Sequence, residues 1–115
     1  MTVEEIATLV QGEFVCGESF KNREVTHIIA SDLMSDVLTV KDTDNLMLMT
    51  GLCNLQSIRT CEMSDIDMLL VVRGKAVTDE MIELAEDNDM VIVATGFSMY
   101  KAAGILYGSG VSSIY

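Results

Sequence analysis

The chain has 115 residues, half of them hydrophobic, and its 18 acidic and 7 basic side chains give a formal net charge of -11. A chain of this length predicts a single domain, residues 1–115, with one hydrophobic core. The negative charge argues against nucleic acid and anionic membrane surfaces as partners, because both are themselves negatively charged.

Apolar runs in the sequence are short. The longest, such as 68–72, fall far below the roughly 18 residues of a membrane-spanning helix, and no basic segment precedes an apolar one at the N-terminus as in a signal peptide. The three cysteines, Cys16, Cys53 and Cys61, form no C-x-x-C pair, which argues against a disulfide framework and a standard zinc site. We therefore expect a cytoplasmic protein with reduced thiols and with neither metal nor cofactor.

The N-terminal part predicts a short helix followed by two strands. Thr2 and Glu5 form a capping box that opens the helix, and Gly12 ends it. Residues 13–16 are apolar enough for a small strand, and residues 25–30 are rich in β-branched side chains that favour a second one.

Beyond the second strand, Ser35 is placed to cap a single helical turn that runs through Val40. From residue 46 onward, apolar runs of strand length alternate regularly with capped segments of helix length. The predicted elements are strands at 46–49, 68–72 and 90–94 and helices at 54–63, 79–87 and 99–107. Strands that alternate with helices pair in parallel, so the fold class is α/β with a mostly parallel sheet.

The last predicted helix contains Ala102, Ala103 and Gly104 together. A glycine inside a helix is destabilising by about 1 kcal/mol, and close packing of a neighbouring backbone is the simplest explanation for it. Residues 110–115 then form either a flexible, frayed tail or a short segment that binds a partner surface.

Polar, small and cationic residues follow four of the predicted strands. They are Ser31, Asp32, Thr50, Gly51, Arg73, Gly74, Lys75, Thr95 and Gly96. The carboxyl ends of parallel strands meet at one edge, where open α/β sheets bind ligands, and hydroxyls, glycine amides and cations suit an anion such as phosphate. The alternative is that these are ordinary turn residues and that the two cations pair with nearby acids.

Two further residues are weaker candidates. His27 lies in a predicted strand with no Asp, Ser or Cys at motif spacing, which favours a structural histidine. Cys53 precedes a helix N-terminus that would lower the pKa of its thiol, although a small core cysteine is the simpler interpretation. No paired carboxylates, catalytic triad, metal cluster or phosphate-binding P-loop motif can be assembled from the sequence.

Several runs resemble the DRTGG domain, in particular its small free-standing form. The matching runs are ASDLMSDVL (30–38), LMTGL (48–52), IRTCEM (58–63), VRGK (72–75) and GILY (104–107). Leu52 stands where the family has a second glycine, and Asn22-Arg23 stands where an Asp-Arg pair is expected. The resemblance implies a three-layer α/β sandwich similar to the N-terminal domain of HPr kinase, usually dimeric, with a regulatory role.

The resemblance also implies partners. Where DRTGG domains adjoin CBS domains in regulated pyrophosphatases, adenine nucleotides bind to the CBS part and the DRTGG part serves as a dimerising spacer. Free-standing members accompany iron-only hydrogenase and electron-transfer subunits, which makes such subunits candidate partners.

We therefore expect a non-catalytic regulatory or assembly module. It would be a homodimer that senses a small anionic or nucleotide-like metabolite at the carboxyl ends of the strands. The alternative is an auxiliary enzyme or maturation factor for a hydrogenase or redox complex that uses Cys53 and Asp32.

Overall fold

The computed structural model describes residues 1–41 and 43–115. Six strands form one sheet: β1 (Glu13–Cys16), β2 (His27–Ala30), β3 (Leu46–Thr50), β4 (Met68–Val71), β5 (Val91–Ala94) and β6 (Ser112–Ser113). Their spatial order is β1-β5-β4-β3-β2-β6, with β1 antiparallel to β5 and every other pair parallel. The predicted α/β class with a mostly parallel sheet is confirmed.

Five α-helices cover the sheet: α1 (Val3–Leu9), α2 (Met34–Val37), α3 (Leu55–Met63), α4 (Asp79–Asp87) and α5 (Met99–Gly108). A side chain caps the N-terminus of each except α2, because Thr2, Asn54, Thr78 and Ser98 each accept a hydrogen bond from the amide three residues on. Of the helices in the described part of the chain, none has the length and apolar character needed to cross a membrane.

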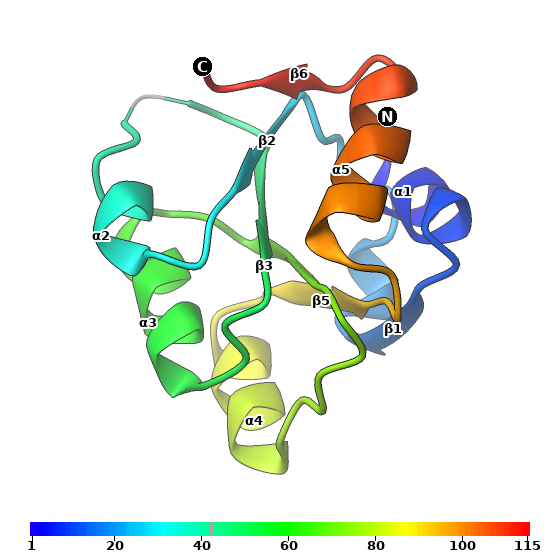
Figure 1. The fold of residues 1–115 in the computed structure, drawn as a ribbon. Coiled ribbons are helices and arrows are strands. Elements are labelled where there is room, and N and C mark those ends of the chain that lie inside the picture. The colour runs from blue at the N-terminus through cyan, green and yellow to red at the C-terminus, as the bar shows by residue number, and fades with distance from the viewer. Residues whose placement is uncertain (42) are drawn as a thin grey trace.

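The direction of the chain across the sheet decides which face each helix covers. From β2 to β5 the strands are added in one direction, and the connecting helices α2, α3 and α4 share one face (Figure 1). After β5 the chain crosses back over the sheet to β6, and a right-handed crossover in the reverse direction must use the opposite face. Helix α5 therefore lies on that face, beside α1.

Strands β3 and β4 are buried along their whole length. Their side chains alternate between two core layers, with Met49 and Leu70 in the α1/α5 layer and Leu48 and Leu69 in the layer under α2, α3 and α4. This burial on both faces explains why the two strands are continuous apolar runs rather than alternating ones.

The predicted cap of the short helix α2 is wrong. The helix follows Leu33, which makes no side-chain cap, and Ser35 lies within the helical turn. The preceding turn instead depends on Ser31, whose hydroxyl oxygen accepts a hydrogen bond from the Leu33 amide at 3.1 Å. The start of the helix is thus set by the turn that leaves β2.

The C-terminal segment adds a strand that the sequence did not indicate. Ser112 and Ser113 pair in parallel with His27 and Ile28, and Val111 is buried. Neither alternative for residues 110–115 included pairing with the chain's own sheet. The outer side of β2 would otherwise be an open edge, and unpaired edge backbone favours the addition of a strand.

Close packing does not explain Gly104. The residue is exposed, and no atom of the described residues lies within 4 Å of the position that a Cβ would take there. No contact within the described chain therefore requires a glycine at position 104.

We expect Gly104→Ala to raise the free energy of unfolding by about 0.5–1 kcal/mol, because alanine has the higher helix propensity and its methyl group meets open space. Gly17→Ala is the matched control: Gly17 has a φ of 74°, and an added Cβ would collide with the carbonyl oxygen of Met90. That variant should lose more than about 1 kcal/mol. Urea unfolding of both variants checks the pair, and a loss of stability in Gly104→Ala would contradict it.

Candidate functional site

The loops that follow β2 and β3 are joined at the carboxyl edge of the sheet by one carboxylate. Asp32 Oδ1 accepts hydrogen bonds from the Gly51 amide at 2.6 Å and from the Thr50 hydroxyl at 3.1 Å. Hydrogen bonds to a charged acceptor are the stronger kind, so this contact fixes the two loops relative to each other.

The loops that follow β4 and β5 are joined by their backbones. The Arg73 amide donates to the Phe97 carbonyl at 2.8 Å, and the Gly74 amide donates to the Thr95 carbonyl at 2.9 Å. The edge is therefore built from two tied pairs of loops, and the predicted convergence of the strand ends on one edge is confirmed.

Gly51 lies between the two pairs. A Cβ at this position would be 3.4 Å from Asp32 Oδ1 and 3.6 Å from Arg73 Nε, so the absence of a side chain leaves room between the carboxylate and the guanidinium. Asp32 and Arg73 do not form an ion pair with each other. The guanidinium thus stands beside a carboxylate that is already engaged by backbone and hydroxyl donors.

Arg73 has an unusual backbone conformation. Its φ is 66°, and that of Gly74 is 67°. Glycine adopts this left-handed region freely, whereas a side chain such as arginine makes it unfavourable by about 1–2 kcal/mol. The other described non-glycine residues with positive φ follow helices or precede β3. A strained arginine at the carboxyl edge is a reason to look for a function there.

Some cations have a partner among the described residues, whereas Lys41, Arg59, Arg73 and Lys75 have none there. Lys21 pairs with Glu4, Arg23 pairs with Asp67, and Lys101 lies over the Phe97 ring. Arg73 and Lys75 are exposed, and no acid in the described ranges lies within ion-pair distance of either. The interpretation that these two cations pair with nearby acids is therefore wrong for residues 1–41 and 43–115.

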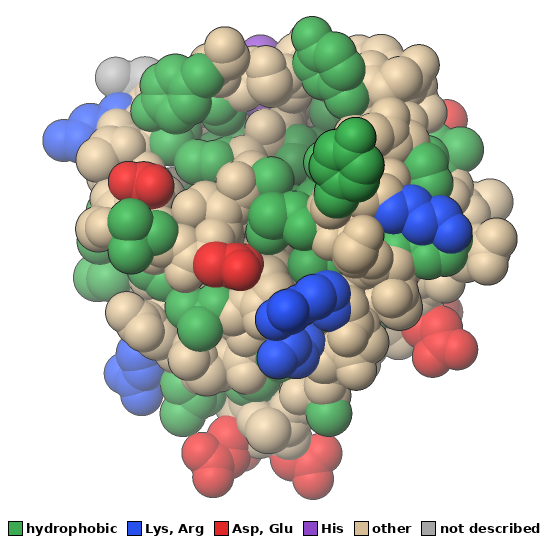
Figure 2. All heavy atoms as spheres, in the orientation of Figure 1, with side chains coloured by type: hydrophobic (Ala, Val, Ile, Leu, Met, Phe, Trp, Pro, Cys, Tyr) green, Lys and Arg blue, Asp and Glu red, His purple; other side chains and the backbone are tan. Residues whose placement is uncertain are grey.

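Figure 2 shows one basic group near the middle of the face that carries α5, with the other basic side chains of this view lying apart from it. Acidic side chains lie beside this group and around the lower rim of the molecule. The central group is thus a small spot of positive charge, with acidic side chains beside it, on a chain whose net charge is -11. An anion site needs local positive charge of this kind.

The three hydroxyls predicted for the site hold the loops in place. Thr50 donates to Asp32, and the buried Thr95 donates to the Val10 carbonyl at 2.6 Å. Ser31 Oγ donates to the Leu33 carbonyl at 3.3 Å. Because each hydroxyl has a single hydrogen, none has a donor left for an anion. The amides of Gly51 and Gly74 are likewise engaged, by Asp32 and by the Thr95 carbonyl. The groups that remain are the Arg73 and Lys75 side chains and the amide of the exposed Gly96.

The structure favours the simpler of the two interpretations of Cys53, an unactivated small thiol. The Cys53 thiol donates to the Ala76 carbonyl at 3.2 Å, and burial raises its pKa above the ordinary value, although the nearby Lys75 charge acts in the opposite direction. The N-terminus of α3 is capped by Asn54. Burial also raises the pKa of Cys16, and it raises that of Cys61 to about 12.

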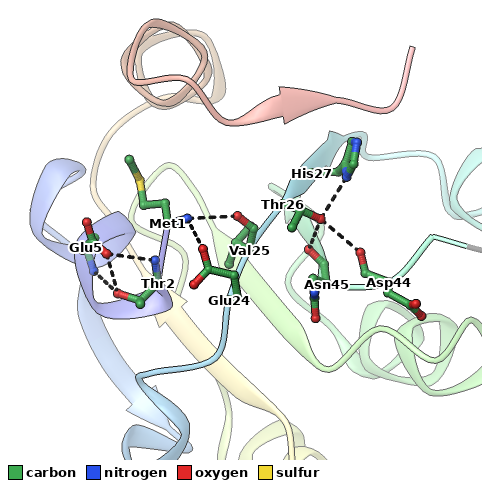
Figure 3. A network of polar contacts seen from close by, with 9 residues as sticks. All are labelled: Met1, Thr2, Glu5, Glu24, Val25, Thr26, His27, Asp44 and Asn45. Atoms are coloured by element: carbon green, nitrogen blue, oxygen red, sulfur yellow. Dashed lines mark hydrogen bonds and ion pairs between the residues drawn. The ribbon is translucent and has the colours of Figure 1, made fainter.

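His27 lies at the opposite edge of the sheet, where the parallel strands begin (Figure 3). Its Nδ1 is 2.9 Å from the Thr26 hydroxyl oxygen, which also lies 3.2 Å from the Asp44 carbonyl. These polar contacts connect the start of β2 with the residues just before β3, which is consistent with a structural role for His27. Within the described residues no group of three or more His, Cys, Asp or Glu is placed to hold a metal.

The structure also contains a pocket that the sequence did not indicate. It has a volume of about 170 Å³ and lies between α5 and the strands β2, β3 and β6, with Ile28, Met49, Ala103, Leu106 and Tyr107 in its wall. No local pattern identifies such a pocket, because it depends on where α5 crosses the sheet. Lys101 is a further cation near the edge that only the position of α5 reveals.

No protein-family model and no curated protein matches the sequence. A solved structure is similar: the crystal structure of the CBS and DRTGG domains of the regulatory region of Clostridium perfringens pyrophosphatase, complexed with the activator diadenosine tetraphosphate. The TM-score is 0.73 at 16% sequence identity, over 91% of this chain and 45% of that one. This chain therefore spans less than half of the length of that structure, and the likeness establishes a shared fold with a CBS and DRTGG regulatory region.

We expect Cys53 to be alkylated more slowly than an ordinary thiol at pH 8. Because burial raises its pKa, the thiolate fraction is small at pH 8 and grows only as the pH rises further. Rates with iodoacetamide between pH 7 and 10, followed for each cysteine by mass spectrometry, check this, with the more deeply buried Cys61 as the slower internal control. A midpoint below the ordinary thiol pKa would restore the auxiliary-enzyme interpretation.

Proposed function

We propose that this chain is a non-catalytic regulatory module, one domain over residues 1–115, that acts in the cytoplasm. It binds a small phosphate-bearing, nucleotide-like anion at the carboxyl edge of its sheet. The observation that supports this most directly is Arg73. Its guanidinium stands beside Gly51 without a described acidic partner, on a backbone held in an unfavourable conformation. Such strain at an exposed residue suggests that its position is needed for more than stability.

The ties between the loops support a preorganised site. Arg73 and Gly74 are held by the β5 loop, and Gly51 is held by Asp32. An anion that binds there would not have to order the backbone, which is one of the main free-energy costs of binding. The two cations belong to one loop, so both can approach one phosphate group or two adjacent ones.

A regulatory role is favoured over catalysis by the state of the two residues that an enzyme would use. Burial raises the pKa of Cys53, and Asp32 Oδ1 is engaged by Gly51 and Thr50. The similar pyrophosphatase structure is that of a regulatory region with a bound activator. Extending that kind of role to this chain is part of the proposal.

The module is further proposed to act as a homodimer. Three tyrosines near the C-terminus are largely exposed, with Tyr100 at 92%, Tyr107 at 72% and Tyr115 at 92%. No acidic residue follows Asp89 in the sequence, so a contact through α5 or β6 would bring few negative charges together. Hydrogenase and electron-transfer subunits are proposed as partners on the resemblance alone.

We expect Arg73→Asn to separate stability from binding. Asparagine tolerates positive φ better than arginine, so the variant should be more stable by about 0.5–1 kcal/mol. Pyrophosphate at 100 times its Kd should stabilise the wild-type protein by about 2.7 kcal/mol. Each tenfold loss of affinity in the variant should remove about 1.4 kcal/mol of that gain. Thermal unfolding with and without pyrophosphate measures both effects.

Arg59→Gln is the matched control, since it removes an exposed cation from α3 and should leave the pyrophosphate effect unchanged. The double variant Arg73→Gln/Lys75→Gln should abolish the effect. Equal stabilisation of the wild-type protein and the double variant, or none in either, would reject the anion site.

We expect light scattering to show a dimer mass at micromolar concentration that falls toward the monomer mass on dilution. The physical reason is that a small domain in which half of the residues are hydrophobic leaves apolar side chains at its surface. Raising the salt concentration should strengthen the dimer by screening the repulsion between two chains of charge -11. A constant monomer mass across the dilution series would contradict the dimer.

A further inference from the structure

The pocket between α5 and the outer strands has the size and lining of an aromatic-ring site. Its volume is about 170 Å³, and its wall is mostly apolar, with Ile28 and Met49 on the sheet side and Ala103, Leu106 and Tyr107 on α5. An apolar cavity of about 150 Å³ is large enough for a benzene ring. Tyr107 is largely exposed at the pocket, where its ring can pack against a flat ligand.

The pocket wall extends along β2 and β3 toward the carboxyl edge, as far as Ala30 and Met49. Met49 lines the pocket, and Gly51 follows it on the same face of the chain, about 7 Å further along. The missing side chain of Gly51 is what leaves the space beside Asp32 and Arg73. In Figure 2, hydrophobic side chains lie immediately above the central basic group. An apolar wall, a carboxylate and a guanidinium thus follow one another along one face.

We propose that this arrangement binds a nucleoside phosphate, with the base in the α5 pocket, the ribose hydroxyls at Asp32 and the phosphates at Arg73 and Lys75. The inference rests on the proposed anion site and adds the chemical class of its ligand. Asp32 Oδ1 is occupied by Gly51 and Thr50, whereas Oδ2 has no hydrogen-bond partner among the described residues. A carboxylate acceptor is the group that nucleotide sites of α/β proteins use for ribose hydroxyls.

Charge favours this occupant over a plain inorganic anion. Asp32 is exposed beside Arg73 and repels any phosphate placed close to it. A ligand that places hydroxyls against the carboxylate and its phosphates further along, at Arg73 and Lys75, avoids the repulsion and gains a hydrogen bond. Asp32 should therefore attract a nucleotide, through its ribose hydroxyls, and repel pyrophosphate.

The experiment compares ADP, adenosine and pyrophosphate by isothermal titration calorimetry. Wild-type protein should bind ADP at least tenfold more tightly than pyrophosphate. Ala103→Leu fills the pocket from α5 and should weaken ADP at least tenfold while leaving pyrophosphate unchanged. Gly104→Leu is the matched control, because it adds the same side chain one residue on, where no described atom lies within 4 Å of the new Cβ; it should leave both affinities unchanged.

Two further variants make the test independent of α5. Ala30→Leu fills the same pocket from β2 and should reproduce the effect of Ala103→Leu. Asp32→Asn keeps an oxygen for the Gly51 amide but removes the charge. It should tighten pyrophosphate and lower the ratio of the ADP affinity to the pyrophosphate affinity.

The outcomes distinguish the two proposals. Pyrophosphate binding that depends on Arg73, with ADP no tighter in any variant, would overturn the nucleotide inference and leave the anion site standing. No binding of any probe would reject both. If Ala103→Leu changes the dimer dissociation constant while the ADP affinity stays the same, the pocket is filled by a second copy of the chain and the inference is wrong.

Discussion

Burial of β3 and β4 on both faces is the constraint on which the rest of the molecule depends. Every side chain of these two strands is buried, and all except Thr50 at the end of β3 lie in one of the two hydrophobic core layers. The centre of the sheet therefore has no position for exposed chemistry. Polar groups are confined to the strand ends and the loops. Because the strands from β2 to β5 run in parallel, their carboxyl ends place those loops at one edge.

That edge uses most of its polar groups for its own stability. Asp32 holds Gly51, and Thr95 holds the carbonyl of Val10. A buried polar group left without a partner would be destabilising by about 1–3 kcal/mol, so these contacts are structural requirements. The exposed groups that remain are the side chains of Arg73 and Lys75. Hydrogen bonds to the β5 loop hold the backbone of their loop in place, although the positive φ of Arg73 is unfavourable. At Arg73, the proposed anion site would therefore come at the expense of stability.

The parts of the fold that local sequence determines could be predicted. The elements from Leu46 onward follow from apolar runs and caps, and the edge position of Arg73 follows from parallel pairing. The cap of α2, the strand at Ser112 and the open surface at Gly104 could not be predicted, because each depends on what another segment brings close. The resemblance to DRTGG domains implied an α/β sandwich, and the structure and its similarity to a CBS and DRTGG region agree with it.

The candidate site, too, could be predicted only in the part that depends on local sequence. Residue type and position placed nine residues at the strand ends, but only the structure shows that the hydroxyls of Ser31, Thr50 and Thr95 are already donating to neighbouring groups. The pocket beside α5 is formed by residues far apart in sequence, from Ile28 to Ser113. No spacing pattern in a single sequence marks it.

The most direct test of the central claim, an anion site at the carboxyl edge, is a titration of the ¹⁵N-labelled protein with pyrophosphate followed by two-dimensional NMR. The account predicts saturable shifts of the amide signals of Gly51, Gly74, Lys75 and Gly96, with the signals of Thr26 and His27 at the opposite edge unchanged. Shifts confined to the opposite edge, or spread evenly over the surface without saturation, would contradict it.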